Sequence, residues 1–314
     1  MIKTAMILSA GAGTRLRPLS GLRPKPLFKV LNKTMLEWWA ETLASAGVKR
    51  LVINVHYRPE LMLERIAIMS ESFKDRLEII PSPESSVLGT GGGIKNAAEL
   101  LGKSDFLVVN ADIFTDFEMV KLALKHLSNP GRLATLGLLE KGVRDDLANV
   151  SMGEGGRIIG FRQPGPLPGE TGRRAYCGAM ALSPEIFNLI PDGECDIIEV
   201  FGAALAKGSD IFGWAYDPAI WSDMGTVKDY WELNRHLAAG RGIVHSTAKI
   251  NGRAAGWNVI GAEAEIKEGA EVENCVLWTS AVISSGAVVK NAVVAGLVPP
   301  GTVVDGGYYC GDCS

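Results

Sequence analysis

The sequence predicts an α/β fold, a doubly wound mixed sheet followed by a small left-handed parallel β-helix, and three observations support this prediction. The chain has 314 residues, of which 47% are hydrophobic and 21% charged, which is enough apolar material for two folded domains. Up to about residue 240, short apolar runs alternate with amphipathic stretches. Farther on, small apolar residues recur every six positions. We therefore expect a first domain over residues 1–240, a β-helix over residues 244–304 and a tail over residues 305–314.

The first domain is expected to contain a Rossmann-like sheet covered by helices. Apolar runs predict strands at residues 4–9, 50–56, 77–81, 105–110 and 133–139. Apolar residues spaced three and four apart predict helices at residues 34–46, 59–70, 91–101 and 116–127. Such sheets bind ligands beyond the carboxyl ends of their strands, which directs attention to the chain from Gly11 onward and to Asp112.

The β-helix is predicted from two apolar registers with a period of six residues. Each triangular coil of a β-helix has sides of about six residues and stacks its inward side chains on the previous coil, whereas helices and hairpins lack this period. The first register comprises Ala264, Ala270, Val276, Val282, Val288 and Val294, and the second Ile260, Ile266 and Val272. A valine-rich set of ordinary strands is the alternative. Gly240 and Gly242 are expected to form the hinge before this part.

Charge, hydropathy and cysteine content argue against a nucleic-acid partner, a membrane span and a disulfide framework. The net charge is -3, from 32 basic and 35 acidic residues, so we expect no nucleic-acid partner. No apolar run approaches the roughly 20 residues that a membrane helix needs, so we expect a soluble, cytoplasmic protein without a membrane partner. Five cysteines make no disulfide framework, and Cys310 and Cys313 are expected to lie in an exposed tail rather than a zinc site.

A glycine-rich loop follows the first predicted strand. Residues 11–19 read Gly-Ala-Gly-Thr-Arg-Leu-Arg-Pro-Leu, and closely spaced glycines let main-chain amides approach a phosphate. A dinucleotide-binding loop would need a third glycine where Leu16 stands, and a nucleoside triphosphatase loop would need Gly-Lys-Ser/Thr. Lys25 follows shortly, and Pro24 and Pro26 stiffen the chain around it into a fixed cation.

Together, residues 11–19 and 24–27 resemble the opening of the sugar-1-phosphate nucleotidylyltransferases. Residues 88–94 resemble the base-recognising loop of this family, residues 108–113 the strand end that supplies one magnesium ligand, and residues 221–226 the segment that supplies the second. The resemblance implies transfer of a nucleoside monophosphate from a triphosphate to a sugar 1-phosphate, with release of pyrophosphate.

The resemblance also implies residue roles. It implies nucleotide contacts at Ala10, Gly11, Gly13, Thr14, Arg15, Lys25, Thr90, Gly91 and Gly92. Arg15, Lys25, Asp112 and Asp223 are the implied catalytic residues, and the two aspartates are the implied ligands of Mg²⁺. Mg²⁺ is usually held by one or two carboxylates together with substrate phosphates, so the aspartates need only converge in space. In-line attack by the sugar phosphate then requires positioning and charge neutralisation but no covalent nucleophile.

The sugar side departs from the family pattern. The resemblance implies sugar contacts at Asn110, Gly178 and Glu199. Many relatives carry Glu-Lys-Pro, whose lysine binds the sugar phosphate, whereas residues 162–164 read Arg-Gln-Pro here. The arginines that could replace this lysine are Arg162, Arg173 and Arg174, because a guanidinium grips phosphate with two bonds.

The sequence leaves open the identity of the nucleobase and two alternatives to a nucleotidylyltransferase. Residues 90–94 and 106–113 resemble N-acetylmuramate-1-phosphate uridylyltransferases, whereas the β-helix resembles the tail of mannose-1-phosphate guanylyltransferases and related adenylyltransferases, so UTP and GTP are both candidates. A hexapeptide acyltransferase would need a histidine base, and residues 246–314 contain none. A non-catalytic regulatory subunit that binds a nucleotide sugar is the other alternative. The missing lysine favours it, whereas the presence of Arg15, Lys25, Asp112 and Asp223 argues against it.

Finally, we expect the C-terminal domain to form a homo-oligomer. Stacked coils leave an end and flat faces, and Trp257, Leu277 and Trp278 are expected to be available for such a face. A chain cut after Arg241 is then expected to be monomeric and active, unless the β-helix also supports a helix at residues 227–238.

Overall fold

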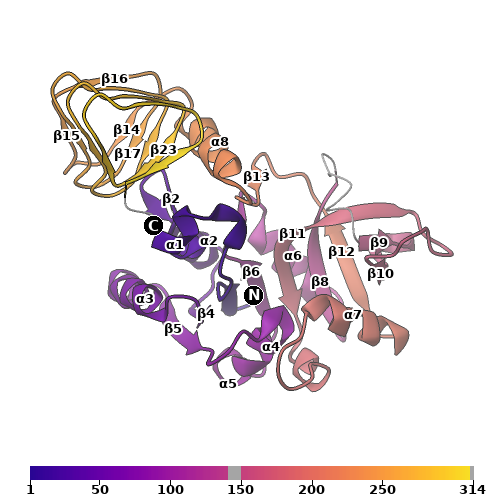
Figure 1. Ribbon diagram of the computed structural model, residues 1–314. Helices are drawn as coiled ribbons and strands as arrows, with labels where there is room; N and C mark the ends of the chain where they lie inside the picture. The colour runs from indigo at the N-terminus through magenta and orange to yellow at the C-terminus, as the bar shows by residue number, and fades with distance from the viewer. Residues whose placement is uncertain (141–149, 312–314) are drawn as a thin grey trace. The chain divides into compact units, whose positions relative to one another are not determined.

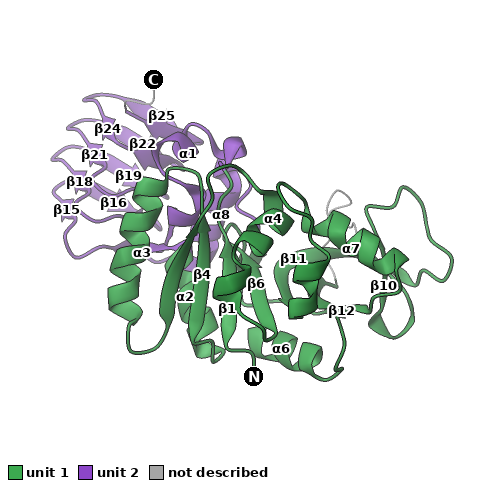
Figure 2. Cartoon of the chain, turned by 90° about the horizontal axis from the view of Figure 1, so that it is seen from below, with its two compact units in different colours: residues 1–11, 36–221 green, residues 12–35, 222–314 purple. Residues whose placement is uncertain are grey.

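The computed structural model describes residues 1–140 and 150–311, and the chain divides into two compact units. Unit 1 consists of Met1–Gly11 and Leu36–Trp221, and unit 2 of Ala12–Met35 and Ser222–Ser314 (Figure 2). The segment that follows the first strand therefore belongs to the same unit as the C-terminal part of the chain. Among the described residues, no helix combines the length and apolar character needed to cross a membrane.

Unit 1 is built on a nine-stranded mixed sheet. Its parallel part has the order β6-β1-β4-β5, with β1 (Thr4–Leu8), β4 (Arg50–Val55), β5 (Glu78–Pro83) and β6 (Phe106–Asn110). The long strand β11 (Gly172–Leu182) runs antiparallel to β6, to β8 (Ala134–Leu139) and to β9 (Val150–Met152). β10 (Ile158–Phe161) pairs with β9, and β12 (Ile211–Ala215) runs parallel to β8. β7 (Phe114–Thr115) and β13 (Trp221–Ser222) form a separate two-stranded sheet.

The helices of unit 1 pack their apolar residues on this sheet. They are α2 (Met35–Ser45), α3 (Pro59–Phe73), α4 (Gly89–Asn96), α5 (Ala98–Leu101), α6 (Met119–Leu127) and α7 (Ile197–Ala206), with short turns η3 (Glu154–Gly156) and η4 (Pro184–Asn188). Met6 and Val108 of the sheet share a buried cluster with Ile94 of α4 and Phe201 of α7. This apolar core holds the carboxyl ends of β1 and β6 side by side.

The predicted α/β sheet is confirmed, including all five predicted strands. The helix predicted at residues 91–101 is instead two helices, α4 and α5. α4 begins earlier than predicted because Gly89 adopts φ +69°, which turns the chain into the helix. Sequence periodicity did not predict β9, β10 and β12, nor the long strand β11.

Unit 2 contains a left-handed parallel β-helix (Figure 1). Strands of successive coils pair in parallel, and they form the three sheets that are its sides. The first sheet comprises β14 (Ile243–Val244), β17 (Val259–Ile260), β20 (Val276–Leu277), β23 (Val293–Ala295) and β26 (Tyr308–Cys310). The second comprises β15 (Lys249–Ile250), β18 (Glu265–Ile266), β21 (Val282–Ile283) and β24 (Leu297–Val298). The third comprises β16 (Arg253–Ala255), β19 (Glu271–Glu273), β22 (Val288–Lys290) and β25 (Val303–Asp305).

The coils do not keep the strict six-residue register that the sequence suggested. Ile260 pairs with Leu277, and Leu277 with Val294, so successive partners lie seventeen residues apart rather than eighteen. A slip of one residue turns a strand side chain to the other face. Val282 and Val288 are therefore only half-buried, while their neighbours Ile283 and Val289 fill the core. The coils also continue past residue 304, to β26.

Three residues expected to form an exposed face are instead buried. Leu277 points into the β-helix core, Trp278 packs against Phe28, and Trp257 packs against Trp231. The expectation that these side chains are available to a second copy is therefore wrong.

The other elements of unit 2 come from the start of the chain and from residues 222–240. They are η1 (Thr14–Leu16), α1 (Leu19–Leu22), η2 (Lys25–Leu27), the hairpin of β2 (Lys29–Val30) and β3 (Lys33–Thr34), and α8 (Val227–Ala238). Thr226 and Asp229 form a reciprocal capping box at the start of α8. Cys177, Cys195 and Cys275 are free thiols. Cys310 is disulfide-bonded and half-buried at the end of β26, so the expectation that it lies in an exposed tail is wrong. Cys313 lies outside the described residues.

Candidate active site

In unit 1, the glycine loop begins at the carboxyl end of β1. Ser9 is buried there, its main-chain N–H donates to Asn54 Oδ1 at 2.6 Å, and its hydroxyl donates to the carbonyl oxygen of Asn54. Asn54 Nδ2 donates in turn to Glu84 Oε1 at 2.7 Å, and burial raises the pKa of Glu84. This buried network fixes the point at which Ala10 and Gly11 leave the sheet, where Gly11 has open space beside its Cα.

The remainder of the loop belongs to unit 2, where it lies beside Lys25. Gly13 adopts the left-handed conformation at φ +60°, and a Cβ placed on it would lie 3.4 Å from Lys25 Cβ. Leu16 N–H donates to the carbonyl oxygen of Gly13 at 3.0 Å, which closes the turn η1 around Thr14. Thr14 and Arg15 are exposed, so this turn presents polar groups to solvent.

Unit 2 also brings Lys25, Arg15 and Asp223 together. The side chain of Lys25 is buried, with 6% of its surface exposed, and its Nζ donates to the carbonyl oxygen of Asp223 at 2.9 Å. A Cβ placed on Gly225 would lie 3.1 Å from Arg15 Nη1 and 3.3 Å from Asp223 Oδ2. Gly225 therefore leaves room for a guanidinium and a carboxylate at the same place.

The loop at residues 88–94 of unit 1 is packed against the segment that precedes α7. Gly91 N–H donates to the carbonyl oxygen of Cys195 at 2.9 Å, and a Cβ on Gly91 would lie 2.6 Å from Cys195 Sγ. Gly92 is buried against the same segment. Thr90 Oγ1 donates to Asp196 Oδ1 at 3.1 Å and accepts from Ile197 N–H at 2.9 Å. These glycines therefore permit close packing that holds Thr90 in place.

Asn110, Asp112 and Gly178 lie near one another in unit 1. Asn110 ends β6 beside Leu8 of β1, and Ala111 N–H donates to the carbonyl oxygen of Leu8 at 3.0 Å. Gly178 adopts φ +89° at an irregularity in β11, and a Cβ on it would lie 2.5 Å from Ile113 Cγ1. Glycine is required there because β11 passes directly over the chain that carries Asp112.

The structure distinguishes the three arginines proposed to replace the missing lysine. Arg173 is committed to local bonds with Glu170 and with the carbonyl oxygens of Gln163 and Gly165, and Arg174 donates to the carbonyl oxygen of Arg173. Arg162 pairs with Asp196, its Nη1 lying 3.0 Å from Oδ2.

Arg162 and Glu199 line the same open cavity of about 540 Å³, together with Gln163. Neither Arg173 nor Arg174 is among the residues that line this cavity.

Two cysteines near these segments are poor nucleophiles. Burial raises the pKa of the Cys177 thiol to about 12, and Cys177 directly precedes Gly178. Burial and then repulsion by Glu199 raise the pKa of Cys195. A thiol reacts as its thiolate, so neither side chain is set up for covalent catalysis at neutral pH.

Sequence reasoning missed three residues of these clusters. Asn54 and Asp196 each bridge separate segments, and Gly225 borders both Arg15 and Asp223. Asn54 gave a usable signal, because it is an amide within the apolar run at residues 50–56. Asp196 is the N-cap of α7, where its carboxylate accepts a hydrogen bond from Ile198 N–H. In the sequence, it therefore looked like an ordinary helix cap.

The donor groups suit Mg²⁺ without forming a protein-only cage. Within residues 1–140 and 150–311, no three His, Cys, Asp or Glu side chains gather in a way that could hold a metal ion. Mg²⁺ takes oxygen ligands and is commonly held by one or two carboxylates plus substrate phosphates, so the carboxylate of Asp112 in unit 1 and that of Asp223 in unit 2 are each of a type that suits this ion.

Comparison with known proteins gives a family match and named relatives. The nucleotidyl transferase family matches residues 4–240. The mannose-1-phosphate guanylyltransferase of Mycobacterium tuberculosis is 29% identical over 307 residues, which cover 91% of this chain and 82% of the relative. The mannose-1-phosphate guanyltransferase of Yarrowia lipolytica is 33% identical over 227 residues, covering 72% of this chain but only 61% of the relative.

Two solved structures share the fold. A UDP-glucose pyrophosphorylase complexed with UDP-glucose superimposes with a TM-score of 0.62 at 19% identity, covering 76% of this chain and 99% of that chain. HddC from Yersinia pseudotuberculosis gives a TM-score of 0.62 at 22% identity, covering 75% of this chain and 100% of its own. At these identities, the likeness concerns the fold alone.

Proposed function

The chain belongs to the nucleotidyl transferase family, as the resemblance of its glycine loop indicated, and we propose that it joins a nucleoside monophosphate from a triphosphate to a sugar 1-phosphate. The observation that carries this proposal is the cluster in unit 2, where Lys25 is buried beside Gly13 and bonded to Asp223. The products are a nucleoside diphosphate sugar and pyrophosphate.

The proposed substrates are GTP and mannose 1-phosphate. The relatives from Mycobacterium tuberculosis and Yarrowia lipolytica bear names that specify guanylyl transfer to this sugar phosphate. The first of them also aligns over 91% of this chain, a length that reaches into the β-helix. UTP is the alternative nucleotide substrate.

The proposed roles follow the chemistry of the side chains. Arg15 and Lys25 neutralise the triphosphate, with the glycine loop supplying main-chain amides, and Thr90 lies in the loop assigned to the base. The phosphate oxygen of the sugar attacks the α-phosphorus in line, the bond to pyrophosphate breaks, and pyrophosphate leaves with the electron pair. The protein positions the two substrates and offsets their charge, so no covalent enzyme intermediate is required.

Asp112 and Asp223 are the proposed Mg²⁺ ligands. When bound, the ion would neutralise charge on the triphosphate oxygens. For the sugar side we assign Asn110, Gly178 and Glu199, with Arg162 as the cation in place of the missing lysine. We also propose a cytoplasmic location, where triphosphates are supplied.

A substrate matrix tests the function. Four nucleoside triphosphates are each combined with a panel of hexose 1-phosphates and Mg²⁺, and pyrophosphate release is measured. The proposal expects the highest kcat/KM with GTP and mannose 1-phosphate. A preference for UTP with another sugar phosphate would overturn the substrate assignment but not the reaction. Tight binding of a nucleotide sugar without turnover in any combination would indicate a regulatory subunit instead.

A further inference from the structure

The segment that carries Lys25 rests on the β-helix. Phe28 is fully buried, with its ring 5.4 Å from that of Tyr230 in α8 and 4.9 Å from that of Trp278, which follows β20. The guanidinium of Arg23 lies 5.5 Å from the centre of the Trp278 ring, a cation–π distance. Residues on both sides of Lys25 therefore contact the same tryptophan.

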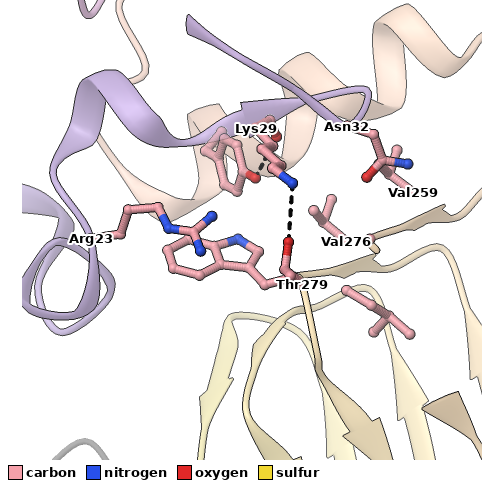
Figure 3. Close-up of a pocket in the computed structure, with 10 residues that line it drawn as sticks. Arg23, Lys29, Asn32, Val259, Val276 and Thr279 are labelled. Carbon is pink, nitrogen blue, oxygen red and sulfur yellow. Dashed lines mark hydrogen bonds between the residues drawn. The ribbon is translucent and has the colours of Figure 1, made fainter. Parts of the chain in front are cut away.

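Hydrogen bonds fix the same segment to the coils. Lys29 Nζ donates to Thr279 Oγ1 at 3.1 Å (Figure 3). Asn32 Nδ2 donates to the carbonyl oxygen of Ile260 at 2.9 Å. The space among these side chains is about 10 Å³, roughly that of a single water molecule. This region is thus a packed contact and leaves no room for a ligand.

The anchor at Phe28 is stiffly connected to Lys25. The 3₁₀ turn η2 is closed by bonds from Phe28 N–H to the carbonyl oxygen of Lys25 at 2.9 Å and from Leu27 N–H to that of Pro24 at 2.9 Å. Pro24 and Pro26 fix two further φ angles. A displacement of Phe28 is therefore passed on to Lys25 rather than absorbed by the intervening chain.

We propose that the β-helix positions Lys25 through Trp278 and Thr279, so that it forms part of the triphosphate-binding apparatus. This inference rests on the proposed function, which assigns the triphosphate to Lys25. It replaces the expectation that a chain cut after Arg241 stays active, because such a chain would lose Trp278 and expose Phe28. A misplacement of about 1 Å can lower a rate by roughly 10².

The test uses the full chain and a matched pair of variants, Trp278→Ala and Trp257→Ala. Both tryptophans lie in the β-helix with 8% and 7% of their surface exposed, but Trp257 packs against Trp231 of α8 instead of Phe28. The kinetic expectation is that only Trp278→Ala lowers kcat/KM for the triphosphate, by about 10- to 100-fold. Trp278→Phe, which keeps an aromatic ring beside Phe28, should restore most of the loss.

A second readout is independent of catalysis. Mild lysine acetylation, followed by peptide mass spectrometry, reports whether Lys25 is shielded, with the exposed Lys228 as the internal standard. The proposal expects Lys25 to become reactive in Trp278→Ala and to stay shielded in Trp257→Ala. Shielding of Lys25 in both variants would overturn the proposal whatever the activities. Exposure of Lys25 in Trp278→Ala with unchanged kinetics would show that Trp278 shields Lys25, but it would overturn the part of Lys25 and of the β-helix in triphosphate binding.

A milder variant covers the case in which Trp278→Ala does not fold. Thr279→Val keeps the side-chain volume and removes the oxygen that accepts from Lys29 Nζ. Loss of a hydrogen bond to a charged donor should raise KM for the triphosphate about tenfold and increase acetylation of Lys25. Unchanged KM and unchanged acetylation in this variant would also overturn the proposal.

Discussion

The side chain of Lys25 donates a 2.9 Å hydrogen bond to the carbonyl oxygen of Asp223, across 198 positions of the sequence. The bond uses the main chain of Asp223 and not its carboxylate. One contact thereby sets the position of a cation and the backbone of a proposed metal ligand. The two residues are structurally coupled, and variants of either are expected to affect triphosphate binding.

Lys25→Ala should lower kcat/KM for the triphosphate by about 10²- to 10³-fold, because it removes a preorganised cation from the developing phosphate charge. Lys228→Ala is the control, since its side chain is 81% exposed in α8. Initial rates of pyrophosphate release at varied triphosphate concentration give the measurement. Equal effects of the two variants would show that Lys25 is not part of the site.

Asp112→Asn and Asp223→Asn should each lower kcat by about 10²- to 10³-fold and raise the Mg²⁺ concentration needed for half-maximal rate. Asparagine keeps the shape of each side chain but removes its charge. Asp192→Asn, at an exposed position on the surface, is the control. Near-normal turnover of either variant at saturating Mg²⁺ would remove that aspartate from the metal site.

Gly178→Ala should both destabilise the protein and raise KM for the sugar phosphate. Its φ of +89° is unfavourable for alanine, and the new Cβ would lie 2.5 Å from Ile113 Cγ1. Gly155→Ala separates the two causes, because Gly155 also has a positive φ, +64°, but nothing within 4 Å of a Cβ. The backbone strain should cost about 1–3 kcal/mol in both variants by urea unfolding. If Gly178→Ala costs no more than Gly155→Ala, the clash with Ile113 is absent.

Acid should destabilise unit 1 through His126. Burial, with a further contribution from the positive charge of Arg132, lowers the pKa of His126 from 6.5 to about 4. Between these pH values the unfolded chain binds more protons than the folded one, so stability falls as the pH drops below about 6.5. The loss should reach about 2 kcal/mol at pH 5. His126→Gln should flatten this part of the pH profile of the unfolding free energy, and an unchanged slope would contradict the assignment.

Self-association through the β-helix should depend on its last coils. Val303 and Leu297 are apolar there, yet 73% and 51% of their surfaces are exposed. We expect the double variant Leu297→Glu, Val303→Glu to be monomeric and the unchanged chain to be oligomeric by light scattering at micromolar concentration. Val244→Glu alters an exposed valine of the first coil and should leave the mass unchanged. A monomeric unchanged chain would refute the oligomer.

The sequence predicted the parallel part of the sheet and β8, because these strands carry apolar runs, but it did not predict β9 to β12. β1, β4 and β6 lie within one or two residues of their predicted limits. The β-helix was also predicted, but its inward register was not. The six-residue repeat of apolar residues does not show where a coil is one residue shorter than the others. Val282 was therefore expected to point into the core of the β-helix, whereas Ile283 occupies that core.

The candidate site was only partly predictable. Lys25 could be recognised from its flanking prolines, whereas its bond to the backbone of Asp223 depends on main-chain atoms that carry no sequence signal. The buried pairing of Asn54 with Glu84 also joins distant segments, and periodicity does not report on such pairs. The tryptophans of the β-helix were misjudged for a similar reason, because their partners Phe28 and Trp231 lie elsewhere in the chain.

The make-up of unit 2 has a consequence for biosynthesis. Its first part, Ala12–Met35, is synthesised before most of unit 1, and its second part, Ser222–Ser314, is synthesised after unit 1. Phe28 therefore lacks its partner Trp278 while the whole of unit 1 is being synthesised, since domains fold as their residues become available. We expect nascent chains stalled before the third coil to leave Lys25 exposed to protease. Synthesis of the third coil, rather than completion of the α/β sheet, would then complete the surroundings of Lys25.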